Sequence, residues 1–219
     1  MTIQRRSEIM DELLEQLIEL PTEQDFDLRL PDPSLVEHYR NRKERVIVVD
    51  YGIDCTLLRE IGCQIINYNR QDKGIEPEKR KPIIMLINSG GGDLEATYAT
   101  IAIMEMSKTP IITINMNCAY SAAGLLLLAG HKRYCCPRSQ MLIHSGSASG
   151  ISGNYEDIQE STKSYKKMIE DLREFVMSKT KIDKKLMDKN KSKDWYLDVK
   201  QQTELGCVDE IITDIDVIL

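Results

Sequence analysis

The chain has 219 residues, of which 42% are hydrophobic and 29% are charged, and its formal net charge is −6 at pH 7. This length and composition allow one domain with a sizeable core that needs no disulfides. The acidic excess argues against a general nucleic-acid-binding surface. Six cysteines without a CxxC pair, beside only three histidines, argue against a metal site.

The sequence shows no secretory signal and no apolar run that could span a bilayer, since the four leucines at 125–128 are far too few. The cysteines lie mostly inside apolar stretches, which fits a reducing compartment. We therefore expect a cytoplasmic protein that binds neither nucleic acid nor membrane.

Residues 1–42 differ in pattern from the rest of the chain. The segment SEIMDELLEQLIEL places its apolar residues on one helical stripe between Ser7 and Pro21, which predicts an amphipathic helix. The residues that follow combine prolines and charge without a clear period, which indicates a linker. We expect an N-terminal helix and linker over 1–42 and the main domain over 43–219.

From residue 43 onward, short β-branched runs alternate with helical patterns. The runs are nearly continuous in apolar character, as is typical of strands that are buried on both faces. This alternation predicts an α/β fold with a largely parallel sheet. Strands are predicted at 45–51, 82–88, 110–116, 133–137 and 140–144, and helices at 55–69, 93–107 and 121–130.

A long helix is predicted over residues 154–180. Five apolar residues fall on one face of this helix, and charged residues crowd the opposite face. We expect the apolar face to pack on a neighbour, in this chain or in another. The five residues are Ile158, Tyr165, Ile169, Leu172 and Val176.

Ser121 stands at the start of an apolar predicted helix, in the segment NCAYSAAGLLLLAG. Its hydroxyl could cap the first turn of the helix. It could also be a nucleophile at the positive end of the helix dipole, which requires a base, an orienting acid and donors for an oxyanion. Both interpretations remain open on this segment alone.

A glycine-rich turn, INSGGGD at residues 87–93, follows a predicted strand and opens a helix. Such a turn exposes backbone N–H groups that can bind an anion, although a tight turn alone also explains it. The segment lacks the Lys-Ser/Thr of a P-loop and does not match the dinucleotide-binding spacing. The sequence therefore predicts no nucleotide site in this chain.

His144 ends a predicted strand, whereas His38 and His131 lie in charged segments and are expected to be exposed. In an open α/β sheet, reactive groups collect at the carboxyl ends of the strands, where His144 and Ser121 both fall. Together with the glycine turn, they indicate an acyl-transfer site. Spacing alone leaves four candidates for the orienting acid, namely Asp183, Asp188, Asp194 and Asp198.

Four separated segments, INSGGG, the serine segment, MLIHSG and DWYLDVKQQTELGCVDEII, resemble the ClpP family of Clp protease proteolytic subunits in order and spacing. The resemblance covers about residues 43–212. It implies the ClpP/crotonase-like fold, a spiral of strand–helix units with a mainly parallel sheet and a protruding long helix.

The resemblance assigns the nucleophile to Ser121 and the general base to His144. The family pattern, an aspartate before an aromatic-leucine pair and a downstream Gly-x-Val-Asp, selects Asp194 as the acid. The family's oxyanion donors fall on the backbone N–H groups of Gly91 and Ala122. The neighbouring loop residues that would contact substrate are Gly92, Ser145 and Gly146.

The family implies a serine endopeptidase that hydrolyses unfolded polypeptides inside a homo-oligomeric chamber of heptameric rings, stacked as a tetradecamer. An AAA+ unfoldase would feed the chamber and would be the component that uses ATP, so no cofactor or metal is expected here. Alternatives are a catalytically silent ring scaffold, an acyl-CoA hydratase or hydrolase of the crotonase group, and a Ser-Lys peptidase using Lys132, Lys163, Lys166 or Lys167.

The chain departs from the family pattern near the expected site. Gly90 replaces the usual proline after Asn-Ser, and Ser145-Gly146 replaces a common Gln-Pro after the histidine. Asn117 and Tyr120 stand where the family usually has smaller residues, and Trp195 replaces the basic residue after the aspartate. We expect altered peptide specificity and altered contacts between rings.

Overall fold

The computed structural model describes residues 33–146 and 152–218. The chain divides into two units, Met1–Tyr39 and Arg40–Leu219. The amphipathic helix predicted between Ser7 and Pro21 lies outside the described residues.

Residues Pro33–Glu44 form a helix, α2, where the sequence predicted a linker. The prediction relied on the lack of an apolar period, but the segment is rich in charged helix formers, and its residues 36–40 are exposed. Arg42 and Lys43 lie in the last turn, where their positive charges interact favourably with the negative end of the helix dipole. The segment lacks an apolar period because the helix has no buried face at these exposed residues.

The second unit is built on a sheet that has seven strands among the described residues. The main path runs β1-β2-β3-β4-β7 with parallel neighbours, β5 also pairs in parallel with β3, and β6 pairs antiparallel with β5. The predicted parallel α/β fold is confirmed. The strands are β1 Val46–Val49, β2 Ile83–Ser89, β3 Ile111–Tyr120, β4 Lys132–Cys135, β5 Gln140–Ile143, β6 Trp195–Leu197 and β7 Glu210–Ile211.

The long strand β3 changes partners along one edge. Its first part pairs with β4 and its last part pairs with β5, where Tyr120 is opposite Leu142. The backbone N–H of Ser121 then donates to Leu142 O at 3.0 Å. The carboxyl ends of β3 and β5 therefore lie side by side, which brings together the residues that follow each strand.

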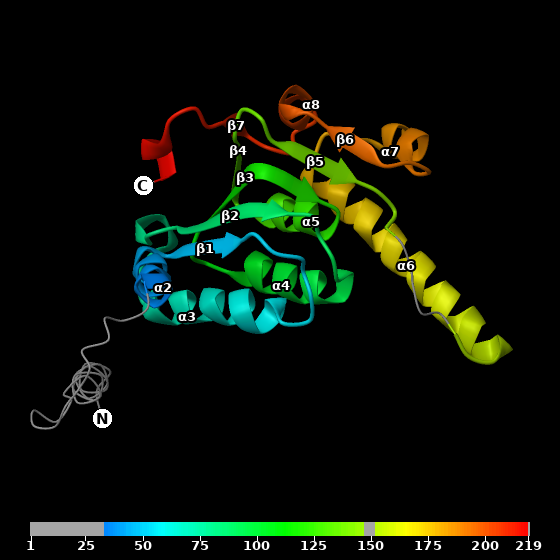
Figure 1. The fold of residues 1–219 in the computed structure, drawn as a ribbon, viewed down its shortest axis with the longest axis horizontal. Helices are drawn as coiled ribbons and strands as arrows, with labels where there is room; N and C mark the ends of the chain where they lie inside the picture. Colours follow the sequence, from blue (N-terminus) through cyan, green and yellow to red (C-terminus); the bar gives the residue numbers. More distant parts are fainter. Residues whose placement is uncertain (1–32, 147–151, 219) are drawn as a thin grey trace, which may run out of the picture. The chain divides into compact units, whose positions relative to one another are not determined.

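Helices cover the sheet, and α3, α4 and α5 lie on the same face of it (Figure 1). The helix predicted at 55–69 begins later than expected, with a π-helical turn over Leu58–Gly62 that leads into α3. The α-helices of this unit are α3 Cys63–Gln71, α4 Leu94–Met106, α5 Ala122–Ala129, α6 Tyr155–Lys179, α7 Lys184–Asn190 and α8 Val199–Glu204, and short 3-10 turns span Pro77–Lys79 and Ile215–Ile218.

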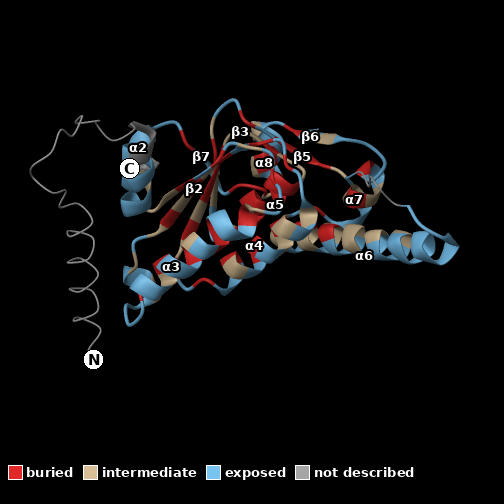
Figure 2. Cartoon of the chain, turned by 60° about the horizontal axis from the view of Figure 1, so that its bottom comes forward, coloured by how far each residue is buried: buried red, intermediate tan, exposed pale blue. Residues whose placement is uncertain are grey.

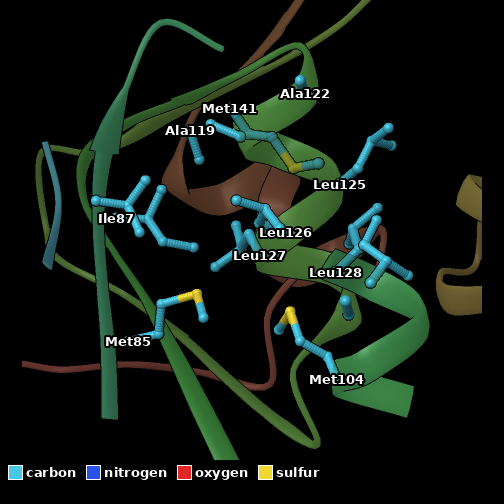
Figure 3. Close-up of a cluster of buried hydrophobic side chains, with 14 of the residues drawn as sticks. Met85, Ile87, Met104, Ala119, Ala122, Leu125, Leu126, Leu127, Leu128 and Met141 are labelled. Atoms are coloured by element: carbon cyan, nitrogen blue, oxygen red, sulfur yellow. The ribbon is translucent and has the colours of Figure 1, made fainter. Parts of the chain in front are cut away.

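Helix α5 lies at the centre of the core. All of its residues, from Ala122 to Ala129, are buried. In Figure 3, Leu126 and Leu127 face the β2 side chains Met85 and Ile87. Burial of a leucine side chain contributes about 1.5–3 kcal/mol, so the start of α5 rests on a tightly packed support.

Helix α6 extends beyond the sheet, and the residues of its N-terminal turns, 155–161, are exposed (Figure 2). Of its predicted apolar face, Leu172 and Val176 are buried against the core, whereas Ile158 is 42% exposed. The helix begins with a capping box between Asn154 and Asp157. The outer half of the apolar face has no covering among the described residues of this chain.

His131 accepts a hydrogen bond at Nδ1 from the N–H of Ile111, the first residue of β3, at 3.0 Å. The residue as a whole is exposed, but its ring is partly buried where it meets β3, and this partial burial lowers the pKa of His131 below the ordinary histidine value; the positive charge of Lys179 lowers the pKa further. Only the neutral ring offers this acceptor.

We expect a pH-dependent stability from His131. Since its folded-state pKa is lowered, its contribution is complete above the ordinary histidine pKa and is lost as the pH falls below that value. His131→Asn keeps an acceptor that does not titrate. Thermal melts between about pH 7.5 and 5 should show a smaller decrease in midpoint for this variant; equal decreases would contradict the role of His131.

Candidate active site

Ser121 occupies the sharp turn between β3 and α5. Its backbone φ is 55°, and Arg45 is the other non-glycine residue with positive φ in the described ranges. Such a conformation costs about 1–3 kcal/mol and persists where the surroundings enforce it. The Ser121 side chain makes no capping hydrogen bond to α5, so the cap interpretation is wrong.

The Ser121 hydroxyl instead contacts His144. The distance between Ser121 Oγ and His144 Nε2 is 2.7 Å, which is a normal length for a strong hydrogen bond. His144 directly follows β5, and the pairing of β5 with the end of β3 places it beside Ser121. A neutral imidazole with its proton on Nδ1 would accept the hydroxyl proton at Nε2.

Asp194 lies on the other side of the imidazole. Its Oδ1 is 3.2 Å from His144 Nδ1, and its side chain is 57% exposed. It directly precedes β6, whose first residue Trp195 pairs with Ile143 of β5. The antiparallel pairing of β5 and β6 therefore sets Asp194 opposite His144.

The other three candidate aspartates have different roles. Asp183 accepts from Leu186 N and caps α7, and Asp198 accepts from Gln201 N and caps α8. Asp188 forms an ion pair with Arg173 of α6, which lowers the pKa of its carboxyl group. Asp194 is therefore the candidate that the fold brings to His144.

The glycine turn after β2 packs directly against the serine turn. Gly91 has a φ of +91°, and a Cβ placed on it would lie 2.4 Å from Tyr120 O and 3.0 Å from Ala122 N. Only glycine permits this approach without displacing the backbone around Ser121. The turn predicted to bind an oxyanion is thus next to Ser121.

Gly91 and Gly92 of this turn direct their N–H groups differently. Gly91 N donates to the buried hydroxyl of Ser89 at 3.1 Å, so the expected donor already has an acceptor. The N–H of Ile53 donates to Gly91 O, and the C=O of Ile53 accepts from Asp93 N, so the backbone groups on both sides of Gly92 face Ile53. Successive residues of a strand direct their backbone groups to opposite sides. Gly92 therefore directs its N–H away from Ile53, and within the described ranges this N–H has no acceptor.

A cavity of about 580 Å³ opens beside Ser121 and His144. All three residues predicted to contact substrate, Gly92, Ser145 and Gly146, line it. Asp93 and Glu95 give the cavity an acidic rim. Its apolar wall is formed by Leu142 and by four residues of α6, namely Tyr165, Met168, Ile169 and Leu172.

Tyr120, which precedes Ser121, forms another wall of this cavity. Its hydroxyl donates to Gln140 Oε1 at 3.0 Å, and its ring meets Tyr196 edge to face at 5.7 Å between centroids. Burial of the ring raises the pKa of Tyr120. Both contacts fix an aromatic side chain next to Ser121, where the sequence showed a departure from the ClpP pattern.

The lysines proposed for a Ser-Lys site have other surroundings. Lys132 lies 4.0 Å from Asp209, and Lys163 and Lys167 pair with carboxylates on the surface of α6. The side-chain nitrogen that contacts Ser121 Oγ is His144 Nε2, at 2.7 Å. The structure therefore favours the histidine over a lysine.

The described part of the chain contains no group of three or more His, Cys, Asp or Glu side chains that could hold a metal ion. In the same part, no helix has the length and apolar character needed to cross a membrane.

A serine hydroxyl, an imidazole and a carboxylate connected in this order, at the carboxyl edge of a parallel α/β sheet, are typical of the serine hydrolases. A model of the Clp protease family matches residues 36–214, which is most of the chain. The chain belongs to the Clp protease family. The family and enzyme class predicted from sequence, a Clp-type serine peptidase, are thereby confirmed.

Curated relatives agree with this family. The chain is 35% identical over 133 residues to ATP-dependent Clp protease proteolytic subunit 2 of Treponema denticola. The aligned residues make up 60% of this chain and 66% of that protein. It is 28% identical over 172 residues to the ATP-dependent Clp protease proteolytic subunit of Deinococcus radiodurans, which covers 78% of this chain and 81% of that protein.

Proposed function

We propose that the chain is an endopeptidase in which Ser121, His144 and Asp194 form the catalytic triad. The contact of 2.7 Å between Ser121 Oγ and His144 Nε2, made from a strained backbone turn, carries this proposal. His144 accepts the Ser121 proton as Oγ attacks the peptide carbonyl carbon, and Asp194 orients the imidazole. His144 then protonates the leaving amine, and water hydrolyses the acyl-enzyme to regenerate Ser121.

The negative charge that develops on the carbonyl oxygen requires donors beside Ser121. Ala122 N, at the start of α5, is one, and the helix dipole favours an anion there. At the glycine turn we assign the second donor to Gly92 N, because Gly91 N already donates to Ser89. Gly91 then has a different role, since its missing side chain allows the two turns to meet.

The test is covalent labelling of the full chain with a fluorophosphonate, together with cleavage of a fluorogenic peptide and of casein. Ser121→Ala should abolish both labelling and cleavage. Ser192→Ala removes an exposed hydroxyl near Asp194 and serves as the control that keeps both. Full labelling of Ser121→Ala would contradict the assignment of the nucleophile.

Two outcomes of the same experiment favour the alternatives. Wild-type protein that assembles but shows neither labelling nor cleavage would indicate a catalytically silent scaffold. Turnover of an acyl-CoA ester without peptide cleavage would indicate a crotonase-type enzyme.

We further propose that copies of this chain form heptameric rings stacked as a tetradecamer, act on unfolded polypeptides in the cytoplasm and work with an AAA+ unfoldase. The relatives are named as proteolytic subunits of ATP-dependent proteases, which supports a separate ATP-using partner. On α6, Tyr155 is 69% exposed and Ile158 is 42% exposed, which is typical of a surface that another subunit covers. Purified chain alone should leave a stably folded substrate intact.

Stacking of the rings is expected to withstand salt. The uncovered face of α6 is apolar, and Trp195, which stands where the family has a basic residue, is partly buried against the core of its own chain. Raising salt from about 0.1 to 1 M shortens the Debye length from about 10 to 3 Å and weakens exposed ion pairs. Double rings that separate into single rings in sedimentation at high salt would contradict an apolar contact.

A further inference from the structure

We propose that Ser145 and Tyr165 are positioning residues that hold His144 and Asp194 in register. This inference rests on the proposed function, because it concerns the pair that would activate Ser121. Ser145 was predicted from sequence to contact substrate. In the structure Ser145 lines the cavity, and both its hydroxyl and its carbonyl also have hydrogen-bond partners within the protein.

The Asp194 side chain has few contacts that could place it. It is 57% exposed, and its contact with His144 Nδ1, at 3.2 Å, is longer than the 2.7–2.9 Å of a strong charge-assisted bond. Within the described residues its carboxylate makes no other hydrogen bond. The position of Asp194 therefore depends on the backbone segment that carries it.

That segment is attached to the His144 segment on both sides of the His144–Asp194 contact. On one side, Trp195 pairs with Ile143 in the β5–β6 ladder. On the other side, the Ser145 hydroxyl donates to Lys191 O at 3.0 Å. Ser145 thus supplies the second attachment between the two segments, whereas the other hydrogen bond of the segment before β6, from Lys193 N to Asn190 O at 3.2 Å, holds it only to the end of α7.

Tyr165 fixes Ser145 from the long helix. Its hydroxyl donates to Ser145 O at 3.0 Å, and its ring is half-buried in the wall of the cavity. The two hydrogen bonds therefore connect α6, the residue after the base and the segment before the acid in one chain of contacts.

We expect Ser145→Ala and Tyr165→Phe each to lower kcat about 5- to 10-fold and to leave KM unchanged. Loss of one hydrogen bond and a small displacement of Asp194 account for this size, since a displacement of 1 Å can cost about 100-fold in rate. Ser145→Thr keeps a hydroxyl donor and should retain most of kcat. A residue that binds substrate directly would raise KM instead.

Matched controls remove the same group at nearby positions. Ser192→Ala removes an exposed hydroxyl from the segment before β6, and Ser164→Ala removes an exposed hydroxyl from α6 next to Tyr165. Both controls should keep wild-type kcat. Kinetics would use a fluorogenic peptide with the assembled full-length protein.

Hydrogen–deuterium exchange gives a readout that does not depend on activity. A peptide covering residues 190–197 should exchange faster in Ser145→Ala than in wild type or Ser192→Ala. An inactive wild type would contradict the proposed function, and the exchange result would then decide the positioning role by itself. Unchanged exchange, a raised KM with unchanged kcat, or a Ser145→Thr variant as impaired as Ser145→Ala would overturn the inference.

Discussion

Replacing His144 with alanine is expected to lower kcat/KM for peptide hydrolysis by about 10⁴- to 10⁶-fold, because the base that accepts the Ser121 proton is removed. The fold should persist, since Asp194 is 57% exposed and is not left as a buried charge. Steady-state kinetics on a fluorogenic peptide would measure the decrease, and a thermal melt would verify folding.

The double variant Ser121→Ala/His144→Ala tests whether Ser121 and His144 act as one catalytic unit or contribute independently to the rate. Residues that act as one unit give strongly non-additive effects, so the double variant should be little worse than either single variant. Rate losses that multiply would contradict the triad, and so would a His144→Ala variant with near-wild-type kcat/KM.

Strands could be predicted from the sequence where apolar β-branched residues form a continuous run. They were harder to predict where the extended conformation depends on pairing with a neighbouring strand. Strand β3 runs to Tyr120, four residues beyond the predicted end at Met116. The added residues, NCAY, are not a β-branched run, and they are extended because β5 pairs with them. Tertiary pairing here overrides the local preference.

The C-terminal elements α7, β6, α8 and β7 were not predicted. Strand β6 has three residues and exists through its pairing with β5, a contact between segments about fifty residues apart. One signal was available, since Asp198 and Gln201 have the spacing of a capping box and form one at the start of α8.

The candidate site could be predicted in part from its place in the sheet. Ser121 and His144 follow from the rule that reactive groups collect at the carboxyl ends of strands. Asp194 could not be chosen in this way, because its position depends on the antiparallel β5–β6 ladder. The family pattern selected it, and the structure places it at His144 Nδ1.

Which of the neighbouring glycines has a backbone N–H without an acceptor was also beyond the sequence pattern. The sequence does not distinguish the roles of Gly91 and Gly92. In the structure, the Ser89 hydroxyl accepts a hydrogen bond from Gly91 N and donates one to Tyr51 O at 2.6 Å. Backbone direction and one buried side chain therefore decide which N–H is free. Neither is visible in the spacing of INSGGGD.

Gly91→Ala is expected to lower kcat/KM by at least 10²- to 10³-fold, the usual cost of losing one oxyanion donor. An L-residue at positive φ costs about 1–2 kcal/mol, and the new Cβ would lie 2.4 Å from Tyr120 O and 2.9 Å from Ser121 Cβ. Relief of these contacts must displace either the glycine turn or the serine turn. Both the oxyanion donors and the Ser121 contact with His144 would then lose their alignment.

Gly90→Ala is the matched control, because a Cβ at Gly90 meets nothing within 4 Å and its φ is not positive. It changes the same turn by the same methyl group and should keep kcat/KM within a few-fold of wild type. Thermal melts and sedimentation would show whether Gly91→Ala still folds and assembles. A folded, assembled Gly91→Ala variant with the activity of Gly90→Ala would show that the contact between the two turns does not set the catalytic geometry.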